Sequence, residues 1–404
     1  MGLSAGRKEN RRLTVESHVT LNHDIIVVVR EWQEKIEDVT WTGARGRDVD
    51  DPPPGLARGH AATIHDVARA AGVSVGTASK ALNGQGKLRA ETIERVQAAA
   101  ARLEYRPNDL MQSLLRGRTH TVGLITTDNG RFSMPLLLGV EDALAAERIS
   151  VFLCPAPNNS PAAPVRERQH IDSLLAKHVE GIIVLGWKID PRPPIDIGRA
   201  HTPVLYVYTS VDRPETLCLL PDDAQGGRLA TAQLLRAGRR RLAHITGPED
   251  WGAVRLRRDA MRDLLHAHGL ALPNDHVLAG PWRSRWGYEA ACRLLDTDPR
   301  IDGLFCGNDQ LASGAMEALR ERGRSVPDDV AVVGFDNWDM FAEETRPPLT
   351  TVDMQIYELG RRAGLRMLGL MKGERESGIV RLPCRLVVRE SCGASSATET
   401  NAIA

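Results

Sequence analysis

The chain has 404 residues, which is too many for one ordinary hydrophobic core, so two or three domains are expected. Its 52 basic and 52 acidic residues cancel, which argues against a uniformly basic protein that coats nucleic acid. No apolar run approaches the roughly eighteen residues that a membrane-spanning helix needs. These properties predict a globular protein of several domains.

Charge is distributed unevenly along the chain. Residues 58–120 carry ten basic and five acidic side chains, a net charge of about +5, while the remainder is mildly acidic. A local excess of positive charge is typical of a module that binds nucleic-acid phosphates.

The six cysteines are scattered and contain no C-x-x-C pair, so we expect buried thiols rather than disulfides or a zinc site. The first twenty residues are polar and lack the apolar segment of a signal peptide. We therefore expect a cytoplasmic protein without a metal ion or a cofactor.

The N-terminal 60 residues are the least informative part of the chain. Residues 50–59, DDPPPGLARG, are typical of a linker because they combine Pro and Gly. We expect residues 1–60 to form an unstructured leader. A wrongly assigned translation start is the alternative.

Residues 62–83, ATIHDVARAAGVSVGTASKALN, predict two short helices joined by a tight turn. Thr63 and Asp66 have the spacing of a capping box at the start of the first helix. Gly72 stands where a left-handed residue would end that helix, and Ser74 would cap the second. The pattern is that of a helix-turn-helix, whose second helix enters the DNA major groove, although a generic helical hairpin has a similar periodicity.

Two further segments follow. Residues 91–105 predict a third, amphipathic helix that closes a small core with the first two. Residues 108–119 could form one or two helical turns, and isolated helices of this length are marginal in water. This segment is either an ordinary linker or a hinge that folds only on DNA.

From residue 121 onward, apolar strands alternate with helices. Such strands predict parallel sheets buried on both faces, and two successive rounds predict two similar α/β lobes with a ligand cleft between them. The expected strands are 121–127, 150–154, 181–185, 203–207, 241–246, 303–306 and 330–335. The expected helices are 134–147, 166–177, 226–236, 257–268, 286–295 and 311–322.

Three motifs stand in order along the chain: TIHDVARAAGVSVGTASKALNG, RPNDLMQSLLRGRT, and GLFCGNDQLASGAMEALRERGRSVPDDVAVVGFDN followed by RPPLTTVD. With them, residues 62 to about 392 resemble a LacI/GalR-family transcriptional repressor. The resemblance implies an N-terminal all-α helix-turn-helix domain and a hinge helix, followed by a two-lobed α/β core like that of periplasmic binding proteins, with two doubly wound parallel sheets.

The resemblance also implies which residues meet DNA. Val75, Gly76 and Lys80 correspond to positions that read base edges, although Gly76 has no side chain and Lys80 lacks the bidentate fork of Arg. In the hinge, Leu114 corresponds to a leucine that wedges into the minor groove. The residues expected at the DNA interface are Thr63, Ser74, Val75, Gly76, Thr77, Ser79, Lys80, Asn83, Asn108 and Leu114.

For the cleft, the resemblance implies that Arg257, Trp282 and Asp309 contact a small-molecule effector. A carboxylate, a guanidinium and an indole suit a sugar, which has hydroxyls and an apolar face. The alternatives are that Asp309 caps the helix beginning near Leu311 and that Trp282 belongs to the core.

The resemblance also implies the lobe boundaries, which complete the expected division of the chain. A leader (1–60), a DNA-binding domain (61–106) and a hinge (107–119) precede a core at 120–393 and a disordered tail at 394–404. The N-lobe would comprise 120–220 and 351–378, and the C-lobe 221–350 and 379–393. The tail has no apolar heptads, so we expect a homodimer rather than a tetramer.

The resulting hypothesis is a repressor of sugar-utilisation genes that a sugar-type effector releases from a pseudo-palindromic operator. The alternatives are a periplasmic-type sugar-binding protein and a regulator that depends on a corepressor. An enzyme is disfavoured because the sequence contains no dinucleotide, phosphate-loop, nucleophile-elbow or zinc-protease motif.

Overall fold

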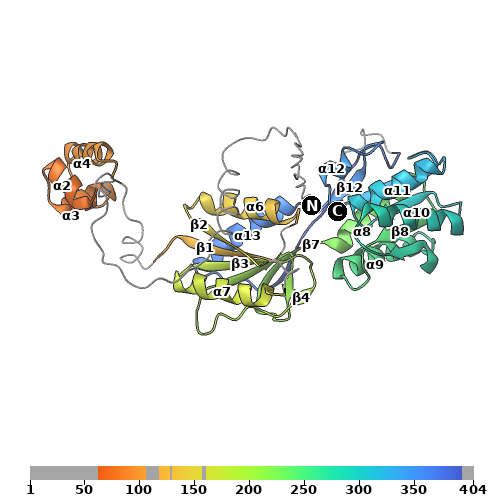
Figure 1. Cartoon of the computed structure of the whole chain (residues 1–404), viewed down its shortest axis with the longest axis horizontal. Coiled ribbons are helices and arrows are strands. Elements are labelled where there is room, and N and C mark those ends of the chain that lie inside the picture. Colours follow the sequence, from red (N-terminus) through yellow and green to blue (C-terminus); the bar gives the residue numbers. More distant parts are fainter. Residues whose placement is uncertain (1–61, 106–117, 128–129, 157–160, 394–404) are drawn as a thin grey trace, which may run out of the picture. The chain divides into compact units, whose positions relative to one another are not determined.

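A computed structural model describes residues 62–105, 118–127, 130–156 and 161–393 (Figure 1). The chain divides into two compact units, residues 1–106 and 107–404. The expectations for the leader, for the hinge residues Asn108 and Leu114, and for the C-terminal tail lie outside the described residues.

The first unit contains the helices α2 (Ile64–Ala71), α3 (Val75–Leu82) and α4 (Ala90–Arg102). The predicted capping box is present, since the Thr63 hydroxyl accepts from the Asp66 N–H and the Asp66 carboxylate accepts from the Thr63 N–H. Gly72 adopts φ 63°, which ends α2 in the left-handed region. The Ser74 hydroxyl accepts from the Thr77 N–H at 3.1 Å and caps α3.

The core of this unit is built from small side chains, which let the three helices approach one another closely. Partly buried residues such as Ile64, Leu82 and Ile93 complete it. Its buried members are Val67, Ala68, Ala71, Ala78, Ala81, Val96, Ala99 and Ala100.

The N-lobe of the second unit is a six-stranded parallel sheet in the order β13-β7-β5-β3-β1-β2. Its strands are β1 (Thr121–Thr126), β2 (Ser150–Pro155), β3 (Gly181–Leu185), β5 (Val204–Val207), β7 (Leu217–Pro221) and β13 (Gly378–Leu382). Its helices are α6 (Ser133–Ala145), α7 (Ala163–Ala176) and α13 (Ile356–Met371). The short strands β4 (Pro191–Arg192) and β6 (Ser210–Val211) pair separately.

The C-lobe sheet has the order β14-β12-β11-β10-β8-β9, with only β14 antiparallel to its neighbour. Its strands are β8 (Leu242–Thr246), β9 (Val277–Ala279), β10 (Gly303–Cys306), β11 (Ala331–Phe335), β12 (Thr350–Asp353) and β14 (Arg385–Val387). Its helices are α8 (Asp223–Arg236), α9 (Gly252–Ala267), η1 (Asn274–His276), α10 (Ser284–Thr297), α11 (Asp309–Glu321) and α12 (Asp339–Ala342).

The chain crosses between the lobes three times: after β7, between β12 and α13, and between β13 and β14. Two crossings lie later than expected. β12 belongs to the C-lobe sheet and β13 to the N-lobe sheet, because each forms its backbone ladder there. The expected boundaries at 350/351 and 378/379 therefore move a few residues towards the C-terminus.

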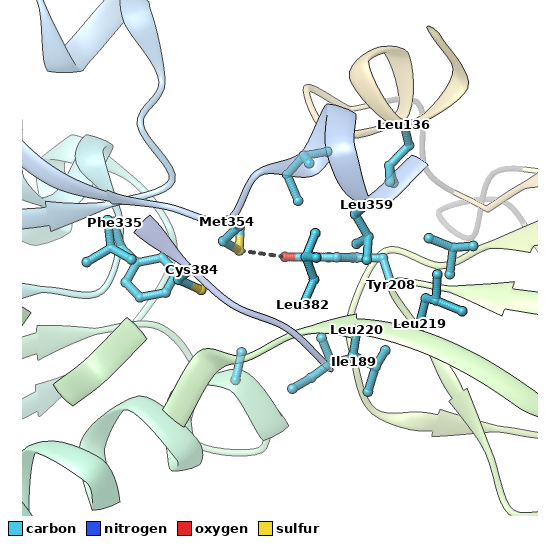
Figure 2. Close-up of a cluster of buried hydrophobic side chains, with 14 of the residues drawn as sticks. Leu136, Ile189, Tyr208, Leu219, Leu220, Phe335, Met354, Leu359, Leu382 and Cys384 are labelled. Carbon is cyan, nitrogen blue, oxygen red and sulfur yellow. Dashed lines mark hydrogen bonds between the residues drawn. The ribbon is translucent and has the colours of Figure 1, made fainter. Parts of the chain in front are cut away.

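The crossing segments pack into one buried cluster (Figure 2). Leu220, Met354 and Leu382 lie at the three crossings, and the Tyr208 hydroxyl lies 3.9 Å from the Met354 sulfur. The apolar core is therefore continuous where the chain passes from lobe to lobe. Among the described residues, no helix is long and apolar enough to cross a membrane.

Helices α6 and α13 pack with their backbones in direct contact. A Cβ added to Gly139 would collide with the backbone oxygen of Tyr357, and one added to Gly360 would collide with that of Leu136. Glycine is required at both positions because the two backbones meet there. α13 was absent from the expected elements, although it supplies this contact.

Candidate functional site

A cavity of about 400 Å³ lies in the second unit and is lined by both lobes. This volume is within the usual range for small-molecule sites, about 300–1,000 Å³. The N-lobe contributes Gly130, Arg131, Phe132, Trp187 and Tyr208. The C-lobe contributes Trp251, Ala253, Arg257, Trp282, Asn308, Gln310, Asp336 and Trp338.

Aromatic side chains dominate the cavity. Six of its thirteen residues are aromatic, whereas aromatic residues make up 4% of the chain, so the walls are strongly enriched in flat apolar surface. On one side, the ring centroids of Trp187 and Trp251 lie 5.0 Å apart, and those of Trp251 and Trp282 lie 5.7 Å apart. This row of indoles begins in the N-lobe and continues in the C-lobe.

A second group of contacts at the cavity is centred on Arg131. Its guanidinium lies 4.5 Å from the Phe132 ring centroid and 4.4 Å from that of Trp338, and it forms an ion pair with Asp336 of the other lobe. The Asp336 side chain is only 3% exposed, and its burial raises the pKa of the carboxyl. Arg131 therefore connects the two lobes at the cavity wall.

A second polar link between the lobes lies at the start of α9. The Asp190 carboxylate of the N-lobe accepts from the Gly252 N–H at 2.9 and 3.1 Å, and its Oδ1 lies 3.3 Å from Arg255. Trp251 is the N-cap residue of α9, but its side chain forms no capping hydrogen bond. Asp190 therefore caps a helix of the opposite lobe, where a carboxylate is also favoured by the helix dipole.

Arg257, predicted to contact the effector, lines the cavity but is buried with most of its donors occupied. It pairs with the buried Asp223 at 2.6 Å, donates to the Gly307 carbonyl at 2.6 Å, and lies 3.5 Å from the Phe335 ring centroid. These contacts fix the position of the guanidinium in the cavity lining.

Asp309, the second predicted contact, is fully buried and is not among the lining residues. Its carboxylate accepts from the Thr351 hydroxyl at 2.6 Å and from the Trp338 N–H at 2.7 Å. Burial, reinforced by Asp336, raises its pKa to about 8. The alternative interpretation, a capping role, is wrong, because the side chain of Asn308 caps α11 by accepting from the Leu311 N–H.

Trp282, the third predicted contact, lines the cavity. Its indole nitrogen is buried and has no hydrogen-bond partner among the described residues. Gly247 accommodates this ring, since an added Cβ would collide with it. The indole therefore presents apolar surface to the cavity, while its nitrogen is buried.

In the first unit, helix α3 carries most of the predicted DNA contacts. Ser74, Gly76 and Lys80 are exposed, and Thr77 and Ser79 are half-buried. Thr63 is exposed at the start of α2, and Asn83 is half-buried at the end of α3. Val75 is half-buried because it packs against the helical core, so only part of its side chain is available.

Both units match known families. Residues 63–108 match bacterial regulatory proteins of the lacI family, and residues 231–392 match a periplasmic binding protein-like domain. The regulator CelR of Thermobifida fusca is 32% identical over 339 residues, which cover 81% of this chain and 98% of CelR. The ribose operon repressor of Escherichia coli K12 is 33% identical over 306 residues, 75% of this chain and 91% of that repressor. The chain belongs to the LacI family.

Solved structures agree with this assignment. A lac repressor dimer bound to operator and the anti-inducer ONPF is 26% identical, with a TM-score of 0.70 and coverage of 83% of this chain and 100% of that chain. A complex of the regulator CelR with cellobiose is 31% identical, with a TM-score of 0.58 and coverage of 82% and 99%. The predicted fold, a helix-turn-helix domain followed by two α/β lobes, is confirmed. The predicted class, a DNA-binding transcriptional regulator, is also confirmed.

Sequence reasoning missed most of the cavity of this LacI-family regulator, including Arg131, Trp187, Tyr208 and Asp336. A signal was available: each of these residues follows the carboxyl end of a parallel strand, where ligands of open α/β sheets bind. In the described part of the chain, no group of His, Cys, Asp and Glu side chains is placed to hold a metal ion.

Proposed function

We propose that this chain is a homodimeric repressor that binds a pseudo-palindromic operator and is controlled by a sugar-type effector in the cavity. One observation carries the proposal: the chain that holds a helix-turn-helix also holds an aromatic-walled cavity with a few charged and amide side chains. The names of the ribose operon repressor and of the CelR–cellobiose complex support a sugar.

The chemistry of the cavity suits a sugar. Indole faces cover the apolar face of a pyranose or furanose ring, while Asp336, Asn308 and Gln310 supply acceptors and donors for hydroxyl groups. We retain Arg257 and Trp282 as proposed effector contacts because both line the cavity. For Asp309 to make the proposed contact, its carboxylate would have to leave the Thr351 hydroxyl and the Trp338 N–H.

In the proposed DNA complex, α3 occupies the major groove. Lys80 would contact a base edge or phosphate as a point charge, and the exposed part of Val75 would contact a base edge. Thr63, Ser74, Thr77, Ser79 and Asn83 would hold phosphates or support the helix. In the hinge, Asn108 would contact DNA and Leu114 would open the central base step of the operator.

The homodimer is supported by apolar side chains of the N-lobe that the other described residues leave exposed. Helices α6 and α13 pack together, and strand β2 is the edge strand of the sheet. Each of these elements exposes large apolar side chains that an isolated protein would normally bury or avoid. They are Met134, Leu138, Phe152, Leu153, Tyr357 and Leu365. A second copy related by a two-fold axis would cover the same side chains on both subunits.

The regulatory step follows from linkage. An effector that binds the closed lobes more tightly than the open ones shifts the core towards closure. If the closed dimer separates the hinges, operator affinity falls, and the operator must weaken effector binding by the same factor.

The first experiment tests the effector. The purified chain is titrated calorimetrically with D-ribose, cellobiose and a panel of other mono- and disaccharides. At least one sugar is expected to bind the wild type, and Trp282→Ala is expected to weaken that sugar markedly. The exposed Arg285→Ala on α10 serves as the control and should bind normally. If no sugar binds, the sugar proposal is wrong.

The second experiment tests DNA binding. Selection of random duplexes by the purified protein should enrich a pseudo-palindrome, and its affinity should fall steeply between about 50 and 200 mM salt. Leu114→Ala should reduce discrimination at the central step. The bound sugar should lower operator affinity in a repressor of the proposed kind, whereas an increase would identify a corepressor-dependent regulator instead. Light scattering should give the mass of a dimer.

A further inference from the structure

The turn between β11 and α12 presents two of the cavity's side chains, Asp336 and Trp338. Its backbone is strained: Asp336 has φ 104° and Asn337 has φ 50°, so two consecutive residues other than glycine occupy the positive-φ region. Such conformations persist only where the surrounding structure holds them, and they are concentrated at functional sites.

Every N–H group of this turn has a defined acceptor. The Asp336 N–H donates to the Val352 carbonyl at 2.7 Å. The Asn337 N–H donates to the Thr351 hydroxyl at 3.3 Å, and the Trp338 N–H donates to Asp309 at 2.7 Å. The Thr351 hydroxyl in turn donates to Asp309 at 2.6 Å. The acceptors of the Asn337 and Trp338 N–H groups are therefore hydrogen-bonded to each other.

The side chain of the turn's second residue is held from the C-terminal end of the core. Arg389 follows β14 and donates to the Asn337 side-chain oxygen at 3.0 Å. The other terminal nitrogen of Arg389 donates to the Leu349 carbonyl at 3.0 Å, and its side chain is only 17% exposed. Its two donors thus connect the strained turn to the segment that precedes β12.

Neither Thr351 nor Arg389 lines the cavity. Both contact Asn337, which lies between the lining residues Asp336 and Trp338. We infer that Thr351 and Arg389 are positioning residues of the effector site, which hold the Asp336–Trp338 turn so that its carboxylate and indole face Arg131 and the cavity. The inference rests on the proposed function for its purpose, but the positioning itself can be measured without an effector.

The physical reason is the strain in the turn. Without Arg389, the Asn337 side chain loses its charged donor, and without the Thr351 hydroxyl the Asn337 N–H loses its acceptor. The backbone can then relax to negative φ, which rotates Asp336 and Trp338 away from Arg131. The glycine at position 334 fits this arrangement, because an added Cβ there would collide with the Asp309 carboxylate.

The test uses the full chain labelled with 5-fluorotryptophan, with the resonances of Trp251, Trp282 and Trp338 each assigned from the spectrum of the corresponding Trp→Phe variant. In Arg389→Lys we expect the Trp338 fluorine signal to shift and broaden, while the signals of Trp251 and Trp282 stay unchanged. Arg385→Lys is the matched control: Arg385 lies on the same C-terminal segment and pairs with Asp353. Its Trp338 signal should be that of the wild type.

A pair of substitutions at position 351 separates positioning from general destabilisation. Thr351→Val should reproduce the Arg389→Lys spectrum, and Thr351→Ser, which retains the hydroxyl, should not. An unchanged Trp338 signal in folded Arg389→Lys or Thr351→Val would overturn the inference. If Arg389→Lys does not fold, the Thr351→Val and Thr351→Ser pair decides.

The last measurement links the turn to the effector. A sugar that binds the wild type should bind Arg389→Lys several-fold more weakly and Arg385→Lys normally. Equal affinity in Arg389→Lys would contradict the role at the effector site. If no sugar binds the wild type, the proposed function fails, but the fluorine spectra still decide whether Thr351 and Arg389 hold the turn.

Discussion

The helix-turn-helix unit and the effector core are stabilised over very different distances along the chain. In the first unit, the contacts that fix the helices are local: Thr63 caps through Asp66, and Ser74 caps through Thr77. In the core, Arg131 pairs with Asp336, about 200 residues away. The comparison teaches that a recognition surface can be specified locally, whereas this ligand cavity requires the complete fold.

The two units also differ in where their charged side chains lie. The capping carboxylate of the first unit, Asp66, lies at the surface, and the Thr63 hydrogen bonds lower its pKa. The core buries Asp223, Arg257 and Asp309 almost completely. Substitutions and pH should therefore affect the core strongly and the first unit weakly, which three experiments can test.

The largest expected effect is that of Asp223→Asn. The change leaves the Arg257 guanidinium buried without its 2.6 Å counter-ion, and breaking a buried pair in this way costs about 3–5 kcal/mol. Urea unfolding followed by hydrogen exchange should show this loss in core peptides and none in residues 62–105. Asp259→Asn, which removes an exposed carboxylate of α9, should change stability by less than about 1 kcal/mol. Equal losses of stability in Asp223→Asn and Asp259→Asn would contradict the claim that the core depends on its buried charges.

The second effect is the response of the core to acid. His244 is completely buried, and burial lowers its pKa from 6.5 to about 4. As the pH falls below about 6.5, the unfolded chain binds a proton at this residue and the folded chain does not. The free energy of unfolding of the core therefore decreases between pH 6.5 and 4. At about 1.4 kcal/mol per pH unit, the loss approaches about 3 kcal/mol.

The matching variant is His244→Asn, whose amide can reproduce the contact of Nδ1 with the Phe305 carbonyl. It should lose this part of the pH dependence when stability is measured by urea denaturation at several pH values. The first unit should keep its stability over the same interval, because the pKa of Asp66 is lowered from 3.8 and its contribution is lost only as the pH falls below that value. If the free energy of unfolding of His244→Asn changes with pH as it does in the wild type, other groups cause the acid response.

The smallest expected effect concerns the cap of α2. Thr63→Ala removes the hydroxyl that accepts from the Asp66 N–H, and loss of such a cap typically costs about 1 kcal/mol. Hydrogen exchange should show weaker protection across α2, with core peptides unchanged. Thr63→Ser keeps the acceptor and should behave as the wild type. Loss of protection in the core after Thr63→Ala would show that the two units are energetically coupled.

The features that the sequence predicts correctly follow the same division. The capping box, the turn at Gly72 and the cap at Ser74 were predicted residue by residue, because each depends on neighbours within three or four positions. Periodicity also predicted the helices α6 to α11 and seven of the twelve strands of the two large sheets, but not β7, β9, β12, β13 and β14. The helix at 356–371 was not among the predictions, and the lobe boundaries were placed a few residues early, because strand pairing decides them.

By itself, the sequence determined the helix-turn-helix, the alternation of strands and helices, and the family. Only the tertiary structure decided what forms the cavity: the Arg131–Asp336 pair, the row of tryptophans, and the burial of Asp309 behind Trp338. The reason is physical. Caps and periodicity are encoded within a few residues, whereas the side chains at the carboxyl ends of strands become neighbours only after the sheet order is established.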